Sequence, residues 1–396
     1  MGRMIHHKSR AHEPNDPFST LQIGYIVASS DQPVNGSERY YFDLLRELPR
    51  VGVTNAGLVL GDLGATSHRE EGVESFAPQS GVSARTRIRN LRSAVRRMKP
   101  QADMIVAHAA EHALPVLDII GRKRLVVHFQ GPRALEYKAE GEGFKRVTLA
   151  RIAELFTYAR ADRFIVLSEA FAEILCKHYH VARKRVSIVP GAVDLQRFRP
   201  QLSRREARAK LGWPPDRPVA LAVRRLAATK GLENLIDSIL LVKAQVPNVI
   251  VALVGGGPLR AALEARVASL GLEDNVRFEG LIAEELLPHA YRAADVSIVP
   301  SVELEGFGLS IVESLACGTA ALVTPVAGLP EVVRDLDAGL ILDGTAPADL
   351  ARGLIKALSD PQSLPTETRC LDYVQRFSWT AIVARVREVY REVLNG

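Results

Sequence analysis

Residues 294–318, "ADVSIVPSVELEGFGLSIVESLACG", combine an apolar run, a glycine loop and a helical pattern. The run "VSIV" has the continuous apolar character of a strand that is covered on both faces of a parallel sheet. After the loop, Leu309, Ile311, Val312 and Leu315 recur at helical spacing. A strand that passes through such a loop into a helix is the repeating unit of doubly wound α/β folds.

The same alternation of apolar runs and helical stretches extends in both directions from this segment. Helical spacing occurs, for example, at 37–52 and 169–180. Two doubly wound, Rossmann-like α/β domains in tandem, with parallel sheets that face each other across a cleft, are therefore expected. The predicted strands lie within 21–30, 102–109, 124–131, 161–168 and 185–192, and then within 217–226, 248–257, 275–282, 294–301, 320–325 and 338–343.

The chain of 396 residues is too long for one ordinary core and suits two domains. The join is expected in 194–218, which is rich in proline and charge. Apolar residues recur at helical spacing from Ile382 to Val393, so the last helix is expected to return to the first domain. The predicted division is a disordered tail at 1–20, an acceptor-binding domain at 21–200, a donor-binding domain at 201–375 and a closing helix at 376–396.

Composition indicates an ordinary soluble protein, with 47% hydrophobic and 24% charged residues. Cys176, Cys317 and Cys370 are too few and too scattered for a metal knuckle or a disulfide framework, which favours a reducing, cytoplasmic setting. No signal peptide or spanning segment is recognised. The first 200 residues carry 30 Lys and Arg against 21 Asp and Glu, so an anionic partner is expected to meet the first half. Nucleic acid is not among the expected partners.

Two glutamates flank the loop of the opening segment. The free amides of a helix's first turn bind anions. A phosphate is therefore expected from Phe307 to Ser310, where the predicted helix begins. Glu305 lies just outside that turn and Glu313 about one turn inside it. Because carboxylates repel phosphate, the hydroxyls of a sugar and a ribose on either side of a diphosphate are their expected partners. The alternative is a solvated helix start whose glutamate is favoured by the helix dipole.

Two further loops follow predicted strands of the second half. In "AVRRLAATKG" (222–231), Arg225 and Lys230 can neutralise a diphosphate, although surface charge beside a helix is the alternative. In "VALVGGGPLRAAL" (251–263), Gly256 and Gly257 belong to a turn that makes room for a ligand or for a neighbouring backbone.

Taken in this order, these three loops resemble the retaining glycosyltransferases of family 4, which have two Rossmann-like domains in the GT-B arrangement. The resemblance covers nearly the whole chain. "NGSERYYFDLLREL" (35–48) is similar to that family's N-terminal glycine loop, "SIVPGAVDLQRFRP" (187–200) to its linker, and "RFEGLI" (277–282) to its base-binding loop.

The resemblance implies a role for each matched position. The donor is a nucleoside-diphosphate sugar, and neither a metal nor another cofactor is expected. The sugar passes to a saccharide, lipid-linked or other glycoconjugate acceptor with its anomeric configuration retained. Arg225 and Lys230 hold the diphosphate, Glu305 binds the sugar together with the amides of Phe307, Gly308 and Leu309, Glu313 takes the ribose hydroxyls, Ile282 lies at the base, and Gly36 lets the first domain approach the phosphates.

Two positions depart from the family pattern. Arg224 stands where the family usually has glycine, as an extra cation or merely a bulkier loop. In "VVHFQG" (126–131), Gln130 aligns with a histidine of the family, and His128 lies two places earlier on the same face of the strand. His128 is therefore a candidate catalytic residue, with a structural histidine as the alternative.

The basic stretch at 85–100 has an apolar stripe that includes Ile88, Leu91 and Val95. Such a helix either packs on its own sheet or lies on an anionic membrane, which would make the protein peripheral on the inner membrane face. The patterns "HAAEH" (108–112) and "DLD" (335–337) are set aside as metal sites. The alternatives to a transferase are a sugar-nucleotide epimerase or hydrolase on the same scaffold and a non-catalytic nucleotide-sugar-binding subunit.

Overall fold

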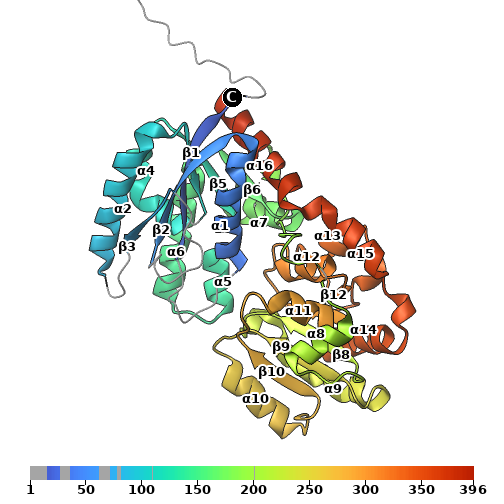
Figure 1. Ribbon diagram of the computed structural model, residues 1–396. Coiled ribbons are helices and arrows are strands. Elements are labelled where there is room, and N and C mark those ends of the chain that lie inside the picture. Colours follow the sequence, from blue (N-terminus) through green and yellow to red (C-terminus); the bar gives the residue numbers. More distant parts are fainter. Residues whose placement is uncertain (1–15, 27–35, 62–71, 78–81, 109, 200) are drawn as a thin grey trace, which may run out of the picture.

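The computed structural model describes residues 16–26, 36–61, 72–77, 82–108, 110–199 and 201–396. These residues form two α/β domains, each built on its own parallel sheet (Figure 1). Strands near the middle of the sheets, such as β4 (Met104–Ala107), β9 (Ile250–Val254) and β11 (Val296–Val299), are buried throughout, as expected for sheets that are covered by helices on both faces.

The first sheet has seven parallel strands in the order β3-β2-β1-β4-β5-β6-β7. One face packs against α1 (Gly36–Glu47) and the last helix, α16 (Trp379–Asn395). The other face packs against helices that include α2 (Ala84–Met98), α3 (Ala110–Ala113), α4 (Leu117–Ile120), α6 (Phe144–Arg160) and α7 (Glu169–Tyr179). The strands are β1 (Phe18–Ile26), β2 (Val53–Leu60), β3 (Val73–Ala77), β4 (Met104–Ala107), β5 (Arg124–Phe129), β6 (Arg163–Val166) and β7 (Val186–Ile188), and α5 (Arg133–Ala139) follows β5.

The second sheet has five parallel strands in the order β10-β9-β8-β11-β12. Their side chains form one large core with the surrounding helices. The strands are β8 (Val219–Val223), β9 (Ile250–Val254), β10 (Val276–Gly280), β11 (Val296–Val299) and β12 (Ala321–Val323). The helices are α8 (Arg204–Leu211), α9 (Leu232–Gln245), α10 (Arg260–Ser269), α11 (Leu287–Ala293), α12 (Leu309–Ala316), α13 (Leu329–Val333), α14 (Pro347–Ser359) and α15 (Glu367–Val374).

Three features differ from the sequence-based expectations. The strands β2 and β3 were not predicted. The run at 338–343 is not a strand, because Asp337 accepts a hydrogen bond from Gly339 N at 2.8 Å and stabilises a 3₁₀ turn over Ala338–Leu340, so that only Ile341 bridges to β12. The predicted tail at 1–20 extends too far, since β1 begins at Phe18, whose side chain is buried; residues 1–15 lie outside the described part.

The chain passes between the domains twice, and the two crossings lie side by side. Val193, on the way into the second domain, donates a hydrogen bond from its amide to Phe377 O at 2.9 Å and forms a parallel bridge with Ser378. Ser378 accepts from Ala381 N and so caps α16. The helix α16 then covers the same face of the first sheet as α1 does (Figure 1). Its residues Ile382, Val386 and Tyr390 are buried in this contact.

The predicted surface helix at 85–100 corresponds to α2, whose Leu91 and Val95 are buried against the first sheet. Ile88 is its exposed apolar residue. The apolar stripe is therefore largely used in packing the helix onto its own domain. Among the described residues, no helix has the length and apolar character that crossing a membrane requires.

Candidate active site

The loop between β11 and α12 lies where the sequence places it. The helix α12 begins at Leu309, and Gly308 before it has a φ of 77°. The predicted phosphate position, Phe307–Ser310, is thus the start of a helix with first-turn amides that lack intrahelical acceptors.

The two glycines of this loop pack against protein. A Cβ atom on Gly306 would lie 2.4 Å from a ring carbon of Phe171 in the first domain, and one on Gly308 would lie 2.8 Å from a methyl carbon of Leu329. Phe307 between them is buried, with its ring against Phe377. The side of each glycine that a side chain would occupy is therefore filled by a protein neighbour.

Glu305 is the centre of a cationic cluster. Its Oε2 accepts hydrogen bonds from Lys230 Nζ at 2.9 Å and from Ser301 Oγ at 2.9 Å, and it pairs with Arg224 Nη2. Burial alone would raise the pKa of Glu305, but Lys230 and then Arg224 outweigh burial and lower this pKa to about 2. Glu305 is thus held as a fixed carboxylate beside two cations.

The two neighbouring arginines at the end of β8 have different surroundings. The side chain of Arg224 is only 5% exposed and lies on Glu305, whereas that of Arg225 is 57% exposed and pairs with Glu140 of the first domain at 3.0 Å. Arg224, which stands where the family usually has glycine, is therefore the arginine that contacts Glu305, the predicted sugar-binding carboxylate. The role of Arg225 at a diphosphate stays a prediction.

Glu313 connects the two domains. Its Oε1 accepts a hydrogen bond from Arg39 Nη1 of α1 at 2.5 Å, and its Oε2 accepts one from Tyr291 OH at 2.7 Å. Arg39 also pairs with Glu284 at 3.4 Å. Sequence reasoning missed Arg39, although it lies within the stretch 35–48 that was singled out.

The glycine turn after β9 makes room for a neighbouring backbone, one of the two expected alternatives. A Cβ atom on Gly255 would lie 1.9 Å from Arg224 O, and one on Gly257 would lie 2.4 Å from Leu226 O. Gly256 faces the side chain of Leu281. The turn therefore fixes the loop that carries Arg224 and Arg225. Ile282, after β10, packs against the core of the second domain.

Gly36, the first residue of α1, lies close to the start of α12. A Cβ atom on Gly36 would be 3.3 Å from Leu309 Cδ1. The first domain thus approaches the predicted phosphate position through this glycine. Residue 35, where the glycine-loop stretch begins, lies outside the described residues.

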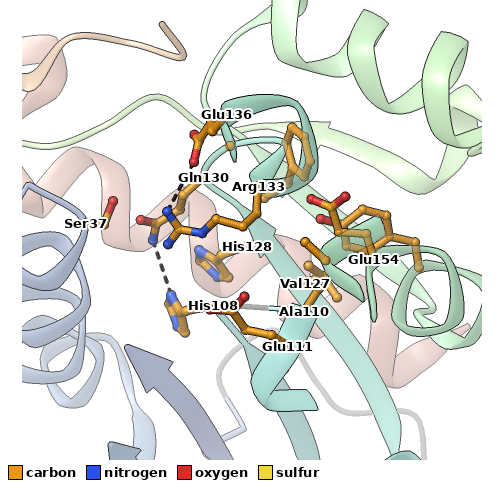
Figure 2. Close-up of a pocket in the computed structure, with 14 residues that line it drawn as sticks. Ser37, His108, Ala110, Glu111, Val127, His128, Gln130, Arg133, Glu136 and Glu154 are labelled. Atoms are coloured by element: carbon orange, nitrogen blue, oxygen red, sulfur yellow. Dashed lines mark hydrogen bonds and ion pairs between the residues drawn. The ribbon is translucent and has the colours of Figure 1, made fainter. Parts of the chain in front are cut away.

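A pocket lies in the first domain at the carboxyl ends of β4 and β5 (Figure 2). The helices α1, α3, α5 and α6 supply most of the remaining wall. The lining residues are Ser37, His108, Ala110, Glu111, Val127, His128, Phe129, Gln130, Gly131, Arg133, Glu136, Ala150, Glu154 and Tyr158. Its position beyond strand ends is the usual place for a ligand in an open α/β sheet.

His128 lines this pocket and also ties α16 to the first domain. Its Nε2 lies 2.7 Å from Tyr390 OH, and its ring stacks on His108 with the ring centroids 4.5 Å apart. Burial lowers the pKa of His128 to about 3, so the imidazole is neutral at physiological pH. These contacts agree with a structural histidine, and a catalytic role stays a prediction. Gln130 lies 3.4 Å from His108 Nδ1 (Figure 2).

The pocket adjoins the cluster around Glu305. Glu136, on the pocket wall, pairs with Arg133 at 3.2 Å (Figure 2). Burial raises the pKa of Glu136, and the positive charges of Arg133 and then Lys230 of the second domain oppose that rise. Lys230 is thus near enough for its charge to act on Glu136. Arg225, in the loop after β8, pairs at 3.0 Å with Glu140, the residue after α5, so this loop of the second domain lies beside the pocket wall.

Glu154, which sequence reasoning missed, is the most deeply buried carboxylate of the pocket, with 1% exposure. It accepts hydrogen bonds from Tyr179 OH at 2.7 Å and Ala134 N at 3.3 Å. Burial raises the pKa of Glu154 to about 7. The carboxyl proton of Glu154 is therefore bound more tightly in the folded state than in the unfolded chain.

We expect Glu154 to lower the stability of the fold as the pH rises from about 4.5 to about 7. Its ionisation above that range costs up to about 3 kcal/mol of unfolding free energy. Glu154→Gln should remove this part of the pH dependence, so the variant gains stability relative to the wild type between pH 5 and pH 8. Urea denaturation across that range measures the difference. A difference independent of pH would contradict the raised pKa.

Among the residues that the structure describes, no three His, Cys, Asp or Glu side chains gather as they would to hold a metal ion. In the set-aside "HAAEH" pattern, His108 Nε2 lies 2.8 Å from Gln22 Oε1, and His112 Nδ1 lies 2.6 Å from Gly24 O. Both rings thus have hydrogen-bond partners on β1.

Two family models match the chain, one on each domain. The model for Glycosyltransferase Family 4 matches residues 34–197, and the model for Glycosyl transferases group 1 matches residues 203–376. The chain belongs to the family 4 glycosyltransferases. Its GT-B architecture of two parallel-sheet domains agrees with that membership.

Members of the family that resemble this chain include D-inositol 3-phosphate glycosyltransferases. The one from Streptomyces bingchenggensis is 35% identical over 246 residues, which are 60% of this chain and 54% of the relative. The one from Thermobispora bispora is 37% identical over 245 residues, which are 59% of this chain and 57% of the relative. The matched part of the chain thus spans little more than half the length of these relatives.

Solved structures share the fold of this chain over nearly its whole length. Sucrose-phosphate synthase from Thermosynechococcus elongatus has a TM-score of 0.77 at 23% identity, covering 95% of this chain and 99% of its own. The Anabaena HepE protein in complex with UDP and glucose has a TM-score of 0.77 at 21% identity, covering 95% of this chain and 100% of its own.

Proposed function

We propose that this chain transfers a sugar from a nucleoside-diphosphate donor to a hydroxyl group of an acceptor, with retention of anomeric configuration. The observation that carries the proposal is the adjacency of two parts: a fixed carboxylate with two cations in the second domain, and a polar pocket in the first. The HepE structure with UDP and glucose supports a donor of this class.

Each described residue has a distinct part in the proposed reaction. Lys230 and the start of α12 neutralise the diphosphate as the bond to the sugar breaks, since fixed positive charge near developing negative charge lowers the barrier. Glu305 accepts hydrogen bonds from the sugar, and Glu313 accepts them from the ribose. The acceptor enters from the pocket around Gln130 and Glu136.

A panel of UDP- and GDP-sugars, tested by thermal shift and then by turnover with saccharide and polyol acceptors, examines the proposal. D-inositol 3-phosphate belongs in the panel because relatives of the family carry that substrate in their names. NMR of the product should show the anomeric configuration of the donor. Free sugar or an epimer formed from donor alone would instead indicate a hydrolase or an epimerase, and donor binding without turnover would indicate a non-catalytic subunit.

Lys230 and the helix start are proposed to act without a divalent cation. We therefore expect turnover in excess EDTA to match turnover without it. If EDTA abolishes turnover and added Mg²⁺ or Mn²⁺ restores it, this part of the proposal is contradicted.

A cytoplasmic setting is also proposed, because Cys176, Cys317 and Cys370 are all free thiols.

A further inference from the structure

The outer surface of α6 is apolar. Of the nine large hydrophobic side chains that are exposed in the described part of the chain, five belong to this one helix. Spacings of three, four and seven residues place most of them on one side of the helix. These five residues, called the α6 stripe below, are Phe144, Leu149, Ile152, Leu155 and Phe156, with exposures of 84%, 67%, 41%, 43% and 63%.

The α6 stripe is not the face that holds the helix in the fold. Ala150, Ala153, Thr157 and Tyr158 are buried on the opposite side. A surface helix normally has one apolar face, directed at the core, and a polar face in water. Because α6 is apolar on both sides, its outer side is expected to meet a partner.

The surroundings of the stripe carry more basic than acidic residues, although Glu142 pairs with Arg146, and Asp162 pairs with Arg124 and Arg160. The helix carries Lys145, Arg146, Arg151 and Arg160, and its one acid, Glu154, is buried on the inner side. At its C-terminal end, Arg160 donates to Gly121 O and Lys123 O at 2.7 Å, and Arg185 donates to Tyr158 O at 3.0 Å. These contacts bring the basic segments 122–124 and 183–185 to the same end of α6.

An apolar strip with a basic border fits the interface of an anionic bilayer, into which apolar side chains insert while cations meet lipid phosphates. A two-fold contact between copies of the chain would instead place the same patch on both subunits and bring these like charges together. The charge distribution therefore favours the membrane over a second copy.

The inner side of α6 forms part of the pocket of the first domain. Ala150, Glu154 and Tyr158 line that pocket (Figure 2). One helix, about 10 Å across, thus separates the pocket from the stripe. A bilayer in contact with the stripe would lie within reach of a ligand that extends out of the pocket.

We infer that α6 docks the protein on an anionic membrane and that the acceptor is anchored in that membrane, with its hydroxyl-bearing head group in the pocket. The statement about the acceptor rests on the proposed function, whereas the docking itself does not. This inference replaces 85–100 by α6 as the membrane-facing helix, since the apolar residues of α2 pack mostly on their own sheet.

Flotation with lipid vesicles tests the docking. The wild type should float with phosphatidylcholine–phosphatidylglycerol vesicles, more weakly at high salt, and remain behind with phosphatidylcholine alone. The double variant Leu149→Glu/Phe156→Glu should lower the partition coefficient by more than about tenfold. The matched control is Leu240→Glu/Leu241→Glu on α9, two other exposed apolar residues, which should float like the wild type.

Calorimetry with UDP and GDP on the same proteins separates the two proposals. The α6 variant should bind nucleotide as the wild type does, which also shows that it is folded. Equal flotation of this variant and the wild type would overturn the docking, and so would a dimer that the same substitutions convert to a monomer without vesicle binding. If neither the wild type nor the two variants bind UDP or GDP, the proposed function is overturned. The flotation result would be unaffected by that outcome.

Discussion

Replacement of Lys230 by alanine should lower turnover by about 10²–10³, the usual loss when one group that stabilises developing charge is removed. The fold should survive, because Glu305 keeps its contacts with Arg224 and Ser301. Steady-state kinetics with donor and acceptor measure the effect. Lys243→Ala is the control, since Lys243 is an exposed lysine of the same domain, on α9. Unchanged turnover in Lys230→Ala would contradict the assigned role.

The pH profile of Lys230→Ala is a second test of the contact between Lys230 and Glu305. Lys230 is the strongest of the groups that lower the pKa of Glu305. Without it, burial is opposed mainly by Arg224, so the pKa of Glu305 rises. If activity needs the ionised carboxylate, the acid limb of kcat in the variant should move to higher pH. A merely structural lysine would leave that limb in place.

Glu313→Ala should weaken binding of the donor by about 10- to 100-fold, because two hydrogen bonds from the ribose to a carboxylate are lost. Turnover at saturating donor should change much less. Calorimetry with the nucleoside diphosphate alone measures the loss. In the structure each oxygen of Glu313 already accepts one hydrogen bond, from Arg39 on Oε1 and from Tyr291 on Oε2, so the ribose hydroxyls are expected to use the second acceptor site of each oxygen.

Glu313→Gln is the matched variant for this measurement. Its amide oxygen can still accept the hydrogen bond from Tyr291, but the charge that holds Arg39 is gone. We expect an intermediate affinity for Glu313→Gln. Unchanged affinity in both variants would mean that Glu313 only joins the domains through Arg39 and that the ribose binds elsewhere.

Much of the fold follows from local patterns. The buried strands of 294–301 and 248–257 are continuous apolar runs, which a single window of sequence displays. The strands β2 and β3, "VTNAGLVL" and "VESFA", include polar residues and lack such runs. Their place in the sheet comes from pairing with β1 and with each other, which no local pattern shows.

The grouping of Lys230 with Glu305 was predictable, because both lie in loops that follow strands of one parallel sheet. Other contacts between distant parts of the chain were not predictable. Arg39 meets Glu313 across 274 positions, and Arg224 meets Glu305 across 81. Arg224 and Arg225 are adjacent, and only the three-dimensional arrangement decides which of the two is turned toward Glu305.

The paired crossings at Val193 and Ser378 constrain how the two domains can move. Because the two segments are hydrogen-bonded to each other, sliding one domain past the other would break that bond, whereas rotation about the line of the crossings would preserve it. The expected motion is a swing about this single axis. Such a swing would part the ion pair between Glu140 of the first domain and Arg225 of the second, while the hydrogen bond between the crossings stays in place.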